Sequence, residues 1–287
     1  MQTIQEAALQ WGIGERQVRT LCENGRIPGA KKQDGVWLIP ADAVKPTRKS
    51  RKPDGLLTRL QAERKHKTHG GIYHRVQVDM TYNSNHIEGS KLTKDQTRFI
   101  YETKTIGLEE NAVIPVNDIV ETVNHFRCMD FIIDTAEKEL TQPYIKRLHA
   151  LLKSGTEDSF AVGDYKKFPN EVGDHVTTPP ENVSAEMARL LTKYKEQEKT
   201  LETLVAFHAD FESIHPFQDG NGRVGRLILF KECLHYGIVP FIITDELRLF
   251  YYRGLSRWKD EKGFLMDTCL TAQDAMKKYL DYFRIPY

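Results

Sequence analysis

Apolar residues recur at helical spacing through most of the chain after Leu56, and this periodicity constrains the fold more than any other feature. Clear stripes run through residues 119–132, 144–152 and 201–214. Residues 165–178 break the pattern with a proline, a glycine and a β-branched run, and two more prolines follow, which is typical of an irregular hairpin between helices. The sequence therefore predicts a mainly α-helical bundle with one small β-hairpin.

Residues 1–46 predict a small separate domain. A capping box at residues 3–6 begins one helix, a glycine turn follows at residues 12–14, and a second helix covers residues 15–24. Residues 27–40 then predict a short hairpin. Two helices joined by a glycine turn and followed by a hairpin resemble the winged helix-turn-helix of excisionases and MerR-type regulators.

This resemblance implies that the first domain binds DNA. Arg16, Gln17 and Arg19 of the second helix would face the major groove, and Lys31 and Lys32 of the hairpin would lie near phosphates. The alternative interpretation is a protein-docking module whose charged side chains are simply solvated.

Charge is unevenly distributed along the chain. Residues 1–53 contain ten lysines and arginines against five acids, a net charge of +5, whereas the whole chain has a formal charge of +1. Because residues 1–53 are basic and the rest of the chain is close to neutral, the sequence indicates a polyanionic partner for the N-terminal segment alone. Residues 47–55 form a basic, proline-containing stretch with few apolar residues, which predicts a linker to a body of residues 56–287.

Other whole-chain features exclude several classes of protein. The four cysteines lie far apart without a C-x-x-C pair, which argues against a disulfide framework or a zinc site. No signal peptide is visible, and the apolar run at residues 238–243 is far too short to span a bilayer. The sequence therefore predicts a cytoplasmic protein without a membrane partner.

Residues 215–226, His-Pro-Phe-Gln-Asp-Gly-Asn-Gly-Arg-Val-Gly-Arg, combine several groups suited to phosphate chemistry. His215 offers a base with an ordinary pKa near neutrality, and Asp219 offers a carboxylate for Mg²⁺. Glycines at the start of a helix let backbone N–H groups converge on an anion. Arg223 and Arg226, three residues apart, would project from one side of that helix toward the same anion.

Each of these features has an ordinary structural explanation on its own. A histidine before a proline is usually structural, Gly-Asn-Gly is usually a turn, and two arginines at helical spacing usually form a solvated face. Their joint occurrence within twelve residues indicates a phosphoryl- or nucleotidyl-transfer site.

The segment matches every fixed position of the Fic family motif, H-x-F-x-[D/E]-G-N-G-R-x-x-R, and the helical body resembles the family's all-α core. The resemblance implies a Fic-type bundle that transfers AMP from ATP, with Mg²⁺, to a Ser, Thr or Tyr hydroxyl of a protein, its own chain included. Gly222 favours AMP transfer, because the Doc-like branch that transfers phosphate carries lysine there.

The same resemblance assigns a role to each motif residue. His215 would be the base that deprotonates the target hydroxyl, and Phe217 would anchor the loop in the core. The remaining motif residues would hold the metal and the triphosphate: Asp219 would bind Mg²⁺, Gly220, Asn221 and Gly222 the α- and β-phosphates, and Arg223 and Arg226 the β- and γ-phosphates.

Two further segments acquire roles by resemblance. The hairpin would be a flap that registers the target chain by strand addition, with the docking residues Glu171, Val172, Gly173 and Asp174. Gly163-Asp164-Tyr165-Lys166 resembles the family's run before the flap, with Lys166 where arginine is frequent. Tyr251 and Tyr252 would contact adenine; ordinary core tyrosines are the alternative.

Residues 84–89, Ser-Asn-His-Ile-Glu-Gly, fit the family's inhibitory pattern [S/T]-x-x-x-E-[G/N] within a helix predicted near residues 80–89. Taken alone, the segment is a helix end with an acid in its last turn and glycine after it. Beside an intact Fic motif, it implies that Glu88 pairs with Arg226 and blocks productive ATP binding, while Ser84 steadies the helix.

Three functions remain open from the sequence. The first is an auto-inhibited adenylyltransferase with a DNA-binding head. The second is a hydrolase that removes AMP from proteins with the same motif, and the third is a transcriptional regulator whose Fic core only senses nucleotide. The resemblance also suggests a homodimer.

Overall fold

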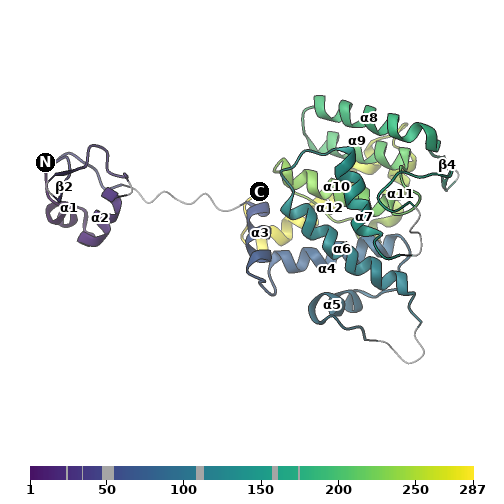
Figure 1. Ribbon diagram of the computed structural model, residues 1–287, viewed down its shortest axis with the longest axis horizontal. Helices are drawn as coiled ribbons and strands as arrows, with labels where there is room; N and C mark the ends of the chain where they lie inside the picture. The colour runs from purple at the N-terminus through teal and green to yellow at the C-terminus, as the bar shows by residue number, and fades with distance from the viewer. Residues whose placement is uncertain (24, 34, 47–54, 108–112, 157–160, 174) are drawn as a thin grey trace. The chain divides into compact units, whose positions relative to one another are not determined.

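The computed structural model describes all of residues 1–287 except 24, 34, 47–54, 108–112, 157–160 and 174. The chain divides into two compact units, Met1–Lys52 and Pro53–Tyr287 (Figure 1). Nearly all of the predicted linker, residues 47–55, lies outside the described residues, and so does Asp174 of the predicted flap.

The first unit contains two helices and a two-stranded antiparallel hairpin. Its elements are α1 (Ile4–Trp11), α2 (Glu15–Glu23), β1 (Lys31–Gln33) and β2 (Val36–Leu38). The predicted capping box is present at the start of α1, where Thr3 and Glu6 bind each other's backbone N–H. Gly12 ends α1 in the left-handed conformation that glycine adopts without strain.

The second unit is mainly helical, which confirms the predicted fold class. Its helices are α3 (Leu56–Lys65), α4 (Ile72–Ile87), α5 (Lys94–Thr103), α6 (Val116–Asp134), α7 (Gln142–Leu152), α8 (Pro180–Glu196), α9 (Leu201–Ile214), α10 (Asn221–His235), α11 (Arg248–Ser256) and α12 (Gly263–Tyr282). A 3-10 turn, η2 (Asp245–Leu247), precedes α11. The predicted hairpin is present as β3 (Glu171–Val172) paired antiparallel with β4 (His175–Val176).

Helix α10 is the centre of the second unit. It packs against α9, α6, α7 and α4, and almost all of its side chains are buried (Figure 1). Leu227, Phe230 and Cys233 belong to the main core, which the predicted apolar stripes of α6, α7 and α9 complete. Because neighbours surround α10, its N-terminal end is held in a fixed place, and the 215–226 loop leads directly into that end.

Among the described residues, no helix combines the length and apolar character needed to cross a membrane.

Candidate functional site

The site begins where α9 ends. His215 caps α9 with a left-handed backbone (φ 52°, ψ 62°), a conformation that is uncommon outside glycine, and its N–H donates to the Phe211 carbonyl at 3.0 Å. Burial and the nearby charge of Lys166 lower the pKa of His215 to about 4. The imidazole is therefore neutral near pH 7, the form in which it can accept a proton.

Phe217 anchors the loop, as the resemblance implies. Its ring is fully buried and stacks on the ring of His149 from α7, with centroids 3.9 Å apart. The Gly163 N–H donates to His149 Nδ1 at 3.0 Å, so Nε2 carries the proton and donates to the Asp219 carbonyl at 3.1 Å. His149 thus fixes two points of the loop, a role that the sequence did not suggest because it lies within an apolar stripe.

Asn221 closes the loop from the other side. Its side-chain Oδ1 accepts from the Phe217 N–H and its Nδ2 donates to the Phe217 carbonyl, both at 2.8 Å. The side-chain amide of Asn221 is therefore engaged with the loop backbone. Any contact of this residue with a phosphate would come from its backbone N–H.

The predicted anion nest lies at the start of α10. Gly220 is the N-cap with φ 80°, a left-handed conformation that a side chain would strain. A Cβ at Gly222 would overlap the carboxylate of Glu88, which therefore lies directly against the start of α10. The N-terminus of a 15-residue helix thus faces a negatively charged side chain, which is the charge that the helix dipole favours there.

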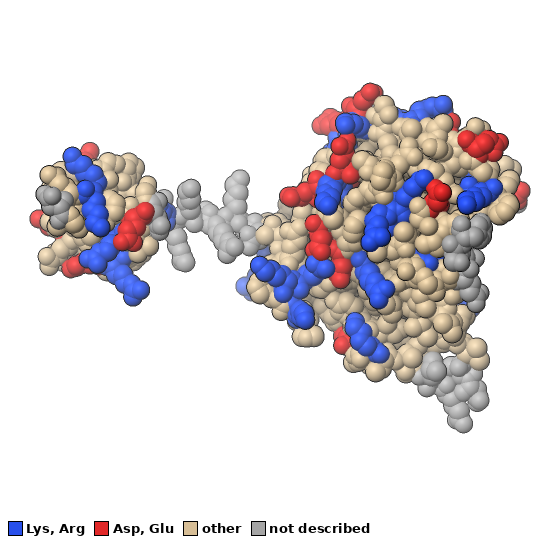
Figure 2. Space-filling view, in the orientation of Figure 1, with Lys and Arg blue, Asp and Glu red and all other residues tan. Residues whose placement is uncertain are grey.

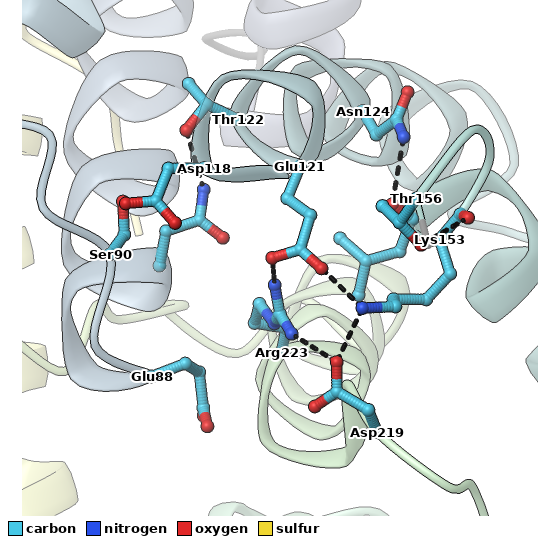
Figure 3. A network of polar contacts seen from close by, with 12 residues as sticks. Glu88, Ser90, Asp118, Glu121, Thr122, Asn124, Lys153, Thr156, Asp219 and Arg223 are labelled. Atoms are coloured by element: carbon cyan, nitrogen blue, oxygen red, sulfur yellow. Dashed lines mark hydrogen bonds and ion pairs between the residues drawn. The ribbon is translucent and has the colours of Figure 1, made fainter. Parts of the chain in front are cut away.

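Four charged side chains form a closed ring beside the nest (Figure 3). Lys153 Nζ donates to Glu121 Oε1 and to Asp219 Oδ2, both at 2.5 Å. Arg223 donates to Glu121 Oε2 and, at 3.2 Å, to Asp219 Oδ2. The side chains of Lys153 and Arg223 are 3% and 5% exposed, whereas that of Asp219 is 48% exposed. Asp219 is therefore the member of the ring that solvent reaches.

Asp219 has the properties of a carboxylate that can share a metal ion with phosphate groups. Despite partial burial, the cations Arg223 and Lys153 lower its pKa to about 2, so it is ionised near neutral pH. Among the described residues, no group of three or more His, Cys, Asp or Glu side chains could hold a metal ion. A single carboxylate next to a phosphate nest fits Mg²⁺, which commonly binds through one or two carboxylates plus substrate phosphates.

Arg226 has different partners from Arg223. Its Nε donates to Ser84 Oγ at 3.0 Å, and its Nη2 donates to the Ser84 carbonyl at 2.9 Å and to Glu88 Oε1 at 2.7 Å. Glu88 is the C-cap of α4 and Gly89 follows with φ 95°. Arg223 and Arg226 are expected to face one anion; in the structure Arg223 pairs with Glu121 and Asp219, whereas Arg226 pairs with Glu88.

Tyr251 and Tyr252 lie on α11, as predicted, but in different surroundings. Tyr251 is fully buried, and its hydroxyl shares a hydrogen bond of 2.8 Å with His208 Nε2. The Tyr252 hydroxyl donates to the Ile87 carbonyl at the end of α4, and its side chain is partly exposed. Of the two, Tyr252 is the one that a ligand could reach.

The flap is joined directly to the loop. The Lys166 N–H donates to the Pro216 carbonyl at 2.9 Å, and Asn170 Nδ2 donates to the Phe217 carbonyl at 3.0 Å. Glu171, Val172 and Gly173 of the hairpin are exposed. The described part of the predicted docking segment therefore lies at the surface within a few residues of these anchors.

The candidate DNA-contacting residues are all exposed on the first unit. Arg16, Gln17 and Arg19 lie on α2, and Lys31 and Lys32 lie on β1. On the visible face of this unit, Lys and Arg side chains lie close together with Asp and Glu side chains between them (Figure 2).

Part of the second unit is similar to known proteins. Residues 139–232 match the profile of the Fic/DOC family. The chain is 32% identical over 185 residues to a protein adenylyltransferase Fic from Nematostella vectensis. The aligned region covers 61% of this chain and 42% of that protein. The chain is 27% identical over 187 residues to the protein of the same name from Drosophila willistoni, covering 61% and 35%. The chain thus spans less than half of these relatives.

Solved structures share the fold. A Fic domain containing signaling protein from Bacteroides thetaiotaomicron superposes with a TM-score of 0.63 at 22% identity, covering 78% of this chain and 94% of that chain. A solved part of Fic-1 from C. elegans gives a TM-score of 0.61 at 20% identity and covers 79% of this chain and 72% of that chain.

Proposed function

We propose that the chain belongs to the Fic/DOC family, whose profile residues 139–232 match, and that it is a protein adenylyltransferase, which moves AMP from ATP to a Ser, Thr or Tyr hydroxyl of a protein. The observation that carries this proposal is a single loop that joins the neutral imidazole of His215, the ionised Asp219 and the N-terminus of α10. The names of the relatives from N. vectensis and D. willistoni support the same activity.

The proposed reaction uses each part of the site once. The target hydroxyl oxygen attacks the α-phosphorus of ATP while the bond to the bridging oxygen of the β-phosphate breaks, and pyrophosphate leaves. His215 accepts the hydroxyl proton. Backbone N–H groups of residues 220–222 and the guanidinium of Arg223 stabilise the charge that develops on the leaving group. When bound at Asp219, Mg²⁺ supplies further positive charge to the phosphates.

We propose that Glu88 inhibits this activity through its pairing with Arg226. The 2.7 Å contact occupies the guanidinium that would otherwise bind the γ-phosphate, and the carboxylate lies against Gly222 at the mouth of the nest. ATP would then bind without its γ-phosphate in the productive position. Ser84 holds Arg226 in the same place through two hydrogen bonds and thereby supports the inhibition.

The test is incubation of the Glu88→Gly protein with ATP labelled at the α- or the γ-phosphorus, with and without a cell lysate. We expect at least a tenfold gain of protein-bound label over the unsubstituted chain, from α-labelled ATP only. The doubly substituted protein, Glu88→Gly with His215→Ala, should carry no label, because it lacks the proton acceptor.

Other results would replace the proposal. Release of free AMP from modified protein, dependent on Glu88, would make the chain a hydrolase. ATP binding without transfer in the Glu88→Gly protein would make it a nucleotide sensor. Equal labelling with and without Glu88 would leave AMP transfer standing and overturn the inhibitory role.

We also propose that the first unit binds duplex DNA through Arg16, Gln17 and Arg19 on α2, with Lys31 and Lys32 on phosphates. Their exposure on one helix and one strand supports this. Gel-shift titrations of the full chain should show affinity that falls steeply with salt and weakens in Arg16→Ala. Affinity that stays equal to that of the unsubstituted chain in both Arg16→Ala and Arg19→Ala would favour a protein-docking module. We propose that the flap residues 171–174 contact the target chain. Tyr252 is the proposed contact for adenine.

A further inference from the structure

The base of the flap is fastened to the three residues that follow His215. The Lys166 N–H donates to the Pro216 carbonyl, Asn170 Nδ2 donates to the Phe217 carbonyl, and the Phe168 N–H donates to Gln218 Oε1 at 3.3 Å. The catalytic loop and the flap therefore move as one piece unless these bonds break.

The side chain of Lys166 ties the two sides of the flap together. Its Nζ donates to Asn170 Oδ1 at 2.7 Å, before β3, and to Thr177 Oγ1 at 2.6 Å, after β4. The Thr177 hydroxyl also lies 2.8 Å from the Asn170 carbonyl and 2.6 Å from Asn170 Oδ1. One ammonium group thus joins the entry and the exit of the hairpin.

This ammonium lies in an unusual environment for a lysine. Lys166 is 3% exposed, and both side chains that receive its hydrogen bonds are uncharged. Burial lowers the pKa of Lys166 to about 8, so most of the population is still charged at pH 7. A buried charge with neutral partners costs stability, and such groups gather at functional sites.

The charge of Lys166 acts on His215. Burial is the largest cause of the lowered pKa of His215 and the positive charge of Lys166 is the next. The backbone carbonyl of Glu212 and the carboxylates of Glu88 and Asp219 act in the opposite direction. Lys166 is therefore the charged group that favours the neutral imidazole against two nearby acids.

We propose that Lys166 is a positioning residue of the site. With Asn170 and Thr177 it clamps the flap to the catalytic loop, and its buried ammonium adds to the effect of burial in favouring the neutral imidazole of His215. The delivery of a target hydroxyl to His215 by the flap rests on the proposed function. The clamp and the effect of the Lys166 charge on His215 do not, because both can be measured in the chain without nucleotide or target.

The test is NMR titration of the His215 ring in the full chain, with the signal assigned through His215→Gln. In Lys166→Met the midpoint should rise by about one pH unit, because a nearby like charge is lost. Lys166→Arg keeps the charge and should keep the midpoint. The matched control is Lys167→Met, which removes one positive charge from the neighbouring exposed side chain and should leave the midpoint in place.

The clamp is tested separately by amide hydrogen exchange. Exchange at the Lys166 and Phe168 amides should become at least fivefold faster in Lys166→Met and in Thr177→Val. The second variant keeps the shape of the threonine side chain and the charge of Lys166. Lys167→Met should leave it unchanged. If Lys166→Met does not fold, Thr177→Val still tests the clamp, and Lys166→Gln tests the charge through a raised His215 midpoint.

Two results would overturn the inference: a His215 midpoint that moves equally in Lys166→Met and Lys167→Met, or unchanged amide exchange in Thr177→Val. In the Glu88→Gly background, the acid limb of the transfer reaction should shift to higher pH with Lys166→Met. Absence of transfer in every variant would contradict the proposed function and leave the NMR and exchange results to decide on Lys166.

Discussion

Arg223 and Arg226 lie three residues apart near the start of α10, but they are held in different ways. Arg223 belongs to the ring with Glu121 of α6 and Lys153 at the end of α7, whose side chains are 14% and 3% exposed. Arg226 is held by Ser84 and by Glu88, whose side chain is 30% exposed at the end of α4. The guanidinium of Arg223 is therefore fixed within the helical bundle, whereas that of Arg226 depends on the partly exposed carboxylate of Glu88.

The difference separates a permanent contact from a replaceable one. The ring is electrically balanced, with two cations and two carboxylates; both cations are buried, and the side chain of Glu121 is only 14% exposed. Glu88 instead lies at the C-terminal end of a helix, where the helix dipole disfavours a negative charge. In the inhibition proposed above, a phosphate would take over the position of Glu88 on Arg226 without opening the framework.

The largest effect should come from breaking the ring. Lys153→Met removes one buried cation and leaves Glu121 and Asp219 with Arg223 alone. Loss of one partner of a buried ion pair costs about 3–5 kcal/mol, so we expect the free energy of unfolding in urea to fall by that amount.

The control for this prediction lies two turns earlier on the same helix. Lys146→Met removes an ion pair with Asp164 whose side chains are 33% and 60% exposed, and it should cost at most about 1 kcal/mol. Equal losses in the two variants would contradict the assignment of the ring to the framework.

The next effect should come from Glu88→Gln, which keeps the shape of the side chain and removes its charge. A hydrogen bond to a charged group contributes about 1.5–3 kcal/mol, so the melting temperature should fall modestly. ATP should restore it, because a ligand at a hundredfold excess over its Kd stabilises by about 2.7 kcal/mol. The shift in Tm with ATP should be larger in Glu88→Gln than in the unsubstituted chain; equal shifts would mean that Glu88 does not compete with nucleotide.

The sequence predicted the local features of the chain. The capping box of Thr3 and Glu6, the hairpin and the glycine-rich start of α10 depend on residues a few positions apart, and the structure contains all three. The pairing of Glu88 with Arg226 spans 138 residues and was expected only through the family resemblance.

The ring was not predicted, for a physical reason. Glu121 and Arg223 are 102 residues apart, and Lys153 and Asp219 are 66 apart, so only the packing of α6, α7 and α10 brings them together. A lysine after an apolar stripe is also what an ordinary helix end contains. The one available signal was Glu121 itself, an acid inside an apolar helical stripe.

A smaller effect should appear in acid. The pKa of Asp219 is about 2 in the folded chain, against about 3.9 for an unfolded aspartate. A lowered pKa gives stability that is present above the unfolded value and is lost as pH falls through the folded value. Because Asp219 is half exposed, we expect a contribution of only about 1 kcal/mol after screening.

Urea unfolding at pH 6, 4 and 3 measures this contribution. The stability difference between the unsubstituted chain and Asp219→Asn should be largest at pH 6 and should shrink by pH 3. A difference that grows as the pH falls would show that Lys153 and Arg223 do not hold the ionised carboxylate.

The smallest effect should be the response of the two arginine sites to salt. Raising NaCl from 0.1 to 1 M shortens the Debye length from about 10 to about 3 Å, which screens exposed charges more than buried ones. The stability lost in Glu88→Gln should therefore shrink by about 0.3 kcal/mol at high salt, while the loss in Lys153→Met stays the same. If the stability losses of Lys153→Met and Glu88→Gln shrink together, solvent reaches the ring as readily as it reaches the pair of Glu88 and Arg226. The contacts of Arg223 would then be as replaceable as those of Arg226.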